Sequence, residues 1–171
     1  MDALLVIDVQ KALIAGAYRE DAVLAAIRTV SETVRARGGI VVFVQHCHAS
    51  FAPLKKGNPG WELHDRLDVR AGDHIVEKQA SDAFYDTELD DLLRSTGVDH
   101  LYVTGLQTEY CVDTTCRSAL SRGYGVTLIG DGHTTGDASL SAAEIIAHHN
   151  VVLANLAHPL NAITVCASSE I

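Results

Sequence analysis

The sequence predicts a three-layer α/β/α fold in which helices cover both faces of a six-stranded, mostly parallel sheet. Two observations lead to this prediction. Short apolar runs are bounded by charged or turn residues, which is typical of strands buried on both faces. Segments with apolar residues at helical spacing alternate with these runs, as crossover helices between parallel strands do.

Each predicted element follows from its local pattern. The apolar runs predict strands at residues 3–7, 40–44, 74–77, 100–104, 126–129 and 162–165. Helical periodicity predicts helices over about residues 20–37, 89–97, 110–122 and 141–153. The stretch 45–73 contains two of the three prolines and is predicted to be a loop. Because no repeat or linker interrupts this order, residues 1–171 are expected to form a single domain.

Composition limits the classes of partner. The formal net charge of -9 argues against nucleic acid, since phosphate binding needs a basic face. No apolar stretch approaches the roughly 18–20 residues that span a bilayer, so no membrane contact is expected. The N-terminal residues lack the basic region of a secretory signal, and we expect a cytoplasmic protein. The four cysteines form no C-x-x-C pair and are expected to be free thiols.

Three reactive side chains follow three of the predicted strands. Asp8 comes after the first strand, Lys78 after the third and Cys111 after the fourth. Because ligands bind beyond the carboxyl ends of parallel strands, we expect these side chains to meet at one edge of the sheet. Any one of them alone is more often structural: a buried thiol, a capping acid or a solvated lysine. Their joint placement favours a catalytic site.

The chemistry expected of this trio is nucleophilic. Cys111 lies at the start of a predicted helix, where free N–H groups and the helix dipole favour a thiolate. Asp8 would take the thiol proton and later deliver it to a leaving amine. Lys78 would hold Asp8 ionised and stabilise the thiolate.

Three motifs resemble those of the isochorismatase-like cysteine hydrolases. They are LLVIDVQ at residues 4–10, EKQASDAF at 77–84 and GLQTEYCV at 105–112, and the resemblance runs from residue 4 to about 140. It implies strand order 3-2-1-4-5-6, a homodimer or homotetramer, and Asp8, Lys78 and Cys111 as the catalytic residues. It also implies a cis peptide bond between Leu106 and Gln107, with the backbone N–H groups of Gln107 and Cys111 forming an oxyanion hole.

The superfamily includes nicotinamidases, carbamoyl-amide hydrolases, ureidoacrylate amidohydrolases and isochorismatases. True isochorismatases cleave a vinyl ether and typically lack the cysteine, so Cys111 favours cleavage of a C–N bond in a small-molecule amide, through a thioester and without a cofactor. An isochorismatase-type ether hydrolase is one alternative. A non-catalytic binding subunit of the same fold is another, although the intact trio argues against it.

Two further sets of residues are candidates by resemblance. Nicotinamidases open a metal site with D-x-H, where this chain has His46-Cys47-His48, and no other histidine follows before Gly60. We therefore expect no metal and expect His46 and His48 to cap the strand and face the pocket, with a metal site at these two histidines as the alternative. The expected substrate-binding residues are Leu13, Trp61, Tyr85, Tyr110 and His133. Trp61 is equally compatible with a subunit contact, and His133 with a turn.

Overall fold

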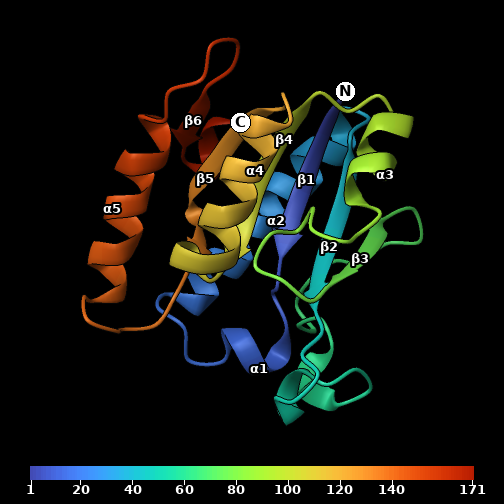
Figure 1. Cartoon of the computed structure of the whole chain (residues 1–171). Helices are drawn as coiled ribbons and strands as arrows, with labels where there is room; N and C mark the ends of the chain where they lie inside the picture. Colours follow the sequence, from blue (N-terminus) through green and yellow to red (C-terminus); the bar gives the residue numbers. More distant parts are fainter.

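The computed structural model describes residues 1–171 and contains one sheet of six parallel strands in the order β3-β2-β1-β4-β5-β6 (Figure 1). The strands are β1 (Asp2–Ile7), β2 (Ile40–His46), β3 (His74–Lys78), β4 (His100–Leu106), β5 (Gly125–Thr134) and β6 (Ile163–Cys166). The predicted fold class and strand order are confirmed, and the sheet is parallel throughout. None of the helices is long and apolar enough to span a membrane.

Helices cover both faces of the sheet because the central strands are apolar on both sides. In β1, Leu5 and Ile7 enter one core and Leu4 and Val6 enter the other. Helix α2 (Glu20–Ala36) covers the Leu4 side. Helices α3 (Leu89–Ser95), α4 (Asp113–Ser121) and α5 (Ala142–Ala154) cover the opposite side, in front of the sheet in Figure 1.

Three local features differ from the predicted elements. A short helix α1 (Lys11–Ile14) follows β1. Cys111 lies in a single π-helical turn, η3 (Thr108–Val112), which precedes α4. Strand β5 continues to Thr134, well past the predicted end of its apolar run, because His133 and Thr134 pair with Gly105 and Leu106 after a register irregularity in β4.

Gly105 sets how closely the end of β4 approaches β1. Its φ is +114°, and a Cβ atom there would lie 2.0 Å from the carbonyl oxygen of Ile7. Only glycine fits this approach. The chain therefore leaves β4 directly beside Asp8, and the next peptide bond, Leu106–Gln107, is cis.

The long loop after β2 is fastened to the sheet edge by Gln10, which is fully buried. The Gln10 side-chain amide donates to the carbonyl oxygens of His46 (3.1 Å) and Trp61 (2.7 Å), and its carbonyl oxygen accepts from the N–H of His46 (2.9 Å). The loop has two short 3-10 turns, η1 (Ala52–Leu54) and η2 (Pro59–Trp61). Gln10 thereby fixes His46 beside the segment that carries Asp8.

Candidate active site

The side chains of Asp8, Lys78 and Cys111 meet at the carboxyl edge of the sheet. The ammonium of Lys78, at the end of β3, lies 2.8 Å from Oδ2 of Asp8 and 3.2 Å from Sγ of Cys111. Asp8 and Lys78 are each 1% exposed, whereas Cys111 is half-buried. The pairing of β3, β2, β1 and β4 in one parallel sheet brings these residues together from distant parts of the sequence.

Asp8 has one carboxylate oxygen to spare. Its backbone takes a φ of +54° as the chain leaves β1. Oδ2 is paired with Lys78, while Oδ1 is buried and has no hydrogen-bond partner. An unpaired buried carboxylate oxygen is costly, so this atom is poised to accept a proton or a hydrogen bond from a neighbouring group.

Burial determines the protonation of the site. It raises the pKa of Cys111 to about 11, and the Asp8 charge adds to this shift while Lys78 opposes it. Burial also raises the pKa of Asp8, against the lowering effect of Lys78. The helix start was expected to favour a thiolate, whereas burial favours the thiol form of Cys111. A thiol is the form from which the expected proton transfer to Asp8 would start.

A pocket of about 420 Å³ opens in front of Cys111. Its lining combines the reactive groups with an apolar wall: Asp8, Leu13, His46, Leu54, Gln107, Tyr110 and Cys111. The backbone N–H of Gln107 donates to no acceptor in the protein, whereas its carbonyl oxygen accepts from the N–H groups of Tyr110 and Val112. The pocket thus brings together a thiol, a carboxylate and a free backbone donor, the groups that nucleophilic acyl transfer would need.

Residues 2–158 match the family model described as the isochorismatase domain. The chain belongs to the isochorismatase family. The predicted membership of the isochorismatase-like hydrolase superfamily is confirmed.

Solved structures of the isochorismatase family share the fold over nearly the whole chain. An isochorismatase family protein is 34% identical with a TM-score of 0.86, and covers 97% of this chain and 98% of its own. N-carbamoylsarcosine amidase from Thermoplasma acidophilum is 30% identical with a TM-score of 0.80, over 99% and 98% of the two chains.

Two further relatives, both named as hydrolases, are longer than this chain. A streptothricin hydrolase of Streptomyces noursei is 40% identical over 140 residues, which are 80% of this chain and 56% of that protein. The ureidoacrylate amidohydrolase of Serratia proteamaculans is 38% identical over 84 residues, 48% of this chain and 34% of that protein. The chain therefore spans only about half the length of the streptothricin hydrolases it matches.

The expected substrate-binding residues are divided among different places. Leu13 and Tyr110 line the pocket in front of Cys111. Tyr85 lies outside it, in a second pocket that is lined by Lys78 but not by Asp8 or Cys111. The Trp61 indole also lies outside it and donates to Sγ of Cys47 at 3.2 Å, with the Lys56 ammonium 5.8 Å from the ring centroid. Trp61 packs on its own loop.

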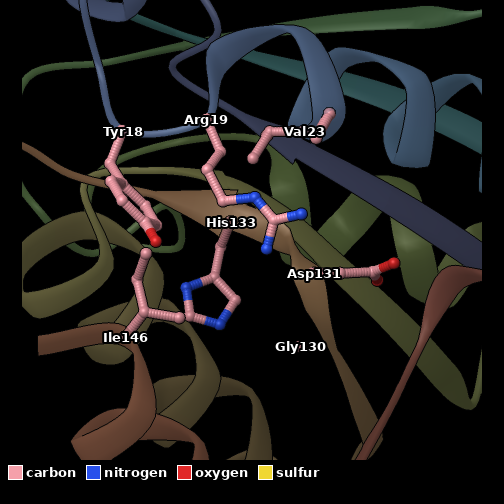
Figure 2. Close-up of a pocket in the computed structure, with 8 residues that line it drawn as sticks. Tyr18, Arg19, Val23, Gly130, Asp131, His133 and Ile146 are labelled. Atoms are coloured by element: carbon pink, nitrogen blue, oxygen red, sulfur yellow. The ribbon is translucent and has the colours of Figure 1, made fainter. Parts of the chain in front are cut away.

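The interpretation of His133 as a pocket residue after β5 is corrected, because His133 lies inside the extended strand. It is 1% exposed, its Nδ1 lies 2.8 Å from Oγ1 of Thr108, and its Nε2 lies 2.8 Å from Oδ1 of Asn150. It lines a separate cavity with Tyr18 and Arg19, shown in Figure 2. His133 therefore braces the η3 turn from behind.

Neither the His46 and His48 pair nor the cluster of Asp8, His46 and Cys111 suits a metal ion. His48 uses Nδ1 to accept from the backbone N–H of Phe51 at 2.9 Å. The donor atoms of Asp8, His46 and Cys111 lie within 4.8 Å of one another, but the Lys78 ammonium is 2.8, 2.9 and 3.2 Å from them. A cation already sits among these donors, and its charge would repel a metal ion.

The sequence did not predict one member of the pocket, Leu54, because the loop around it has no periodicity. His46 lines the pocket, as expected of a histidine that caps its strand and faces the site, but its contact with Lys78 was not foreseen: its Nδ1 lies 2.9 Å from the Lys78 ammonium. The register that places His46 opposite Lys78 in β2 and β3 would have predicted this contact.

Proposed function

We propose that the protein is a cysteine hydrolase that cleaves a C–N bond of a small-molecule amide through a thioester on Cys111. The proposal depends chiefly on one observation, the contact of the Lys78 ammonium with both Asp8 (2.8 Å) and Cys111 (3.2 Å) at the base of a pocket. The printed names of two relatives, an amidohydrolase and an amidase, support an amide-type bond.

The first half of the reaction forms the thioester. Asp8 accepts the proton of the Cys111 thiol through its unpaired Oδ1 as Sγ attacks the substrate carbonyl carbon. Lys78 balances the charge that moves between sulfur and carboxylate. The N–H groups of Gln107 and Cys111 stabilise the oxyanion. Asp8 then gives its proton to the departing nitrogen as the C–N bond breaks.

The second half returns the enzyme to its resting state. Asp8, again a carboxylate, takes a proton from a water molecule that attacks the thioester carbonyl. The C–S bond breaks, the acid product leaves, and Asp8 returns the proton to sulfur. The raised pKa of the buried Asp8 carboxyl suits a group that must accept and release a proton in each half.

The experiment replaces Cys111 with Ala and with Ser and screens small amides for ammonia release. We expect both variants to fold and turnover to fall by at least about 10³-fold, because the covalent route is lost. With a slow substrate, mass spectrometry should find an acyl adduct on Cys111 of the unaltered protein. A Cys111→Ala variant with near-normal turnover would refute the proposal.

The same screen separates the alternative functions. Cleavage of vinyl ethers without an adduct, and unaffected by Cys111→Ala, would indicate an ether hydrolase. Tight binding of an amide without turnover, by the unaltered protein as well as by the Cys111 variants, would indicate a binding subunit.

We also propose that the chain forms a homo-oligomer. Apolar side chains are exposed on and beside α5: Leu140 is 51%, Val151 64% and Leu160 86% exposed. Covering them with a second copy would remove apolar surface from water. Light scattering should give at least twice the 18.3 kDa of one chain, and a concentration-independent monomer would exclude it.

A further inference from the structure

His46 lines the pocket and contacts Lys78, yet it has no role in the proposed mechanism. It ends β2, is half-buried, and lines the pocket with Asp8 and Cys111. Its backbone is held on both sides by the Gln10 side chain. The position of its ring is therefore fixed by the fold.

The Lys78 contact determines which nitrogen of His46 bears the hydrogen. An ammonium has three hydrogens and no lone pair, so it can only donate. Nδ1 of His46, 2.9 Å from the Lys78 ammonium, must therefore accept. A neutral imidazole that accepts at Nδ1 carries its single hydrogen on Nε2.

The ring is neutral in this environment. Burial lowers the pKa of His46, the positive charges of Lys78 and His48 act in the same direction, and together they bring it to about 4. In the imidazole ring Nε2 points away from Nδ1, and hence away from Lys78. The Nε2–H donates to no group of the protein, and His46 is open to the pocket. It is a free donor held at a defined orientation.

We propose that His46 is a substrate-binding residue whose Nε2–H donates to an acceptor atom attached beside the scissile carbonyl, in a tautomer fixed by Lys78. The inference rests on the proposed function and narrows its substrate class. Amides that carry a second oxygen acceptor near the reacting carbonyl would be preferred over simple alkyl amides.

Nitrogen-15 NMR of the histidine rings tests the tautomer without a substrate. At pH 7 we expect His46, assigned by comparison with His46→Asn, to be protonated at Nε2 and unprotonated at Nδ1. A ring protonated at Nδ1, or at both nitrogens, would overturn the assignment. The result does not depend on whether the protein is a hydrolase.

Two variants separate the two nitrogens. In His46→Asn the side-chain oxygen can replace Nδ1 as the acceptor for Lys78, but nothing replaces Nε2–H. In His46→Gln the longer amide can present a donor near Nε2 but not the Nδ1 acceptor. The probes are iodoacetamide, which has a carbonyl acceptor, and allyl bromide, which has none. Alkylation of Cys111 is followed by peptide mass spectrometry.

We expect His46→Asn to lower the ratio of iodoacetamide to allyl bromide rates by about threefold to tenfold, the effect of one hydrogen bond. His46→Gln should keep the ratio within about twofold, and circular dichroism should show all three proteins folded. Equal ratios in all three proteins would overturn the proposal. Failure of the Cys111 experiment with a normal ratio change would instead count against the hydrolase and leave the donor role of His46 intact.

Discussion

His46 and His133 lie on opposite sides of the η3 turn and show how one residue type serves two purposes. Behind the turn, both ring nitrogens of His133 are engaged, by Thr108 and Asn150. In front of it, His46 engages Lys78 through one nitrogen and leaves the other open to the pocket. A buried imidazole with hydrogen bonds at both nitrogens stabilises the fold, whereas one with a single hydrogen bond keeps the other nitrogen available to a ligand.

Removing the base in front of the turn should have the largest effect. Asp8→Asn keeps the shape but cannot accept a proton, so turnover should fall by about 10²–10⁴-fold. Because the Asp8 charge raises the pKa of Cys111 and Lys78 lowers it, alkylation of Cys111 at pH 8 should become faster. Ammonia release and iodoacetamide labelling measure the two effects. Slower labelling together with lost turnover would contradict the charge balance described here.

The brace behind the turn should affect stability instead. His133→Phe leaves Thr108 and Asn150 without their buried partner, and we expect the free energy of unfolding to drop by roughly 3 kcal/mol, or roughly 6–12 °C in melting temperature. The matched control is His46→Asn, on the pocket side of the η3 turn, which should lower the free energy of unfolding by less than about 1 kcal/mol. Urea unfolding measures both. Similar losses of stability for the two variants would contradict the interpretation that His133 stabilises the fold and His46 does not.

The comparison also shows what the sequence can predict. Unbroken apolar runs identified the strands, and their ends located Asp8, Lys78 and Cys111, because parallel strands present their carboxyl ends at one edge. The polar residues Asp131, Gly132 and His133 gave no strand signal, since their pairing with β4 follows a register irregularity rather than a local pattern. The raised pKa of Cys111 had no local signal either, because the neighbours that bury the thiol are distant in sequence.

Acid should destabilise the folded protein through the buried ring of His133. Burial lowers the pKa of His133 to about 4, so between pH 6.5 and 4 the unfolded chain binds a proton that the folded chain does not. Stability from this group is complete above pH 6.5 and falls by about 1.4 kcal/mol per pH unit below it, roughly 3 kcal/mol in all. The difference in urea stability between the unaltered protein and His133→Phe should therefore shrink as pH falls. If this difference in stability does not change with pH, His133 is protonated as readily in the folded as in the unfolded chain, and its pKa is not lowered.

The smallest expected effect distinguishes two exposed tyrosines near the site. Tyr110 is 55% exposed and lines the pocket in front of Cys111. Tyr85 is 67% exposed and lines the second pocket, to which Lys78 contributes but Cys111 does not. If substrate occupies the front pocket, Tyr110→Ala removes apolar contact made equally in the ground and transition states. KM should then rise about threefold to tenfold with kcat within about twofold.

Tyr85→Ala is the matched control for Tyr110→Ala, since it deletes an equally large and exposed ring from the other pocket. It should leave KM and kcat within about twofold. A larger rise in KM for Tyr85→Ala than for Tyr110→Ala would place the substrate in the second pocket, which Tyr85 lines. His46 would then face the wrong pocket to bind it, so this small difference also tests which opening the substrate uses to reach the thiol.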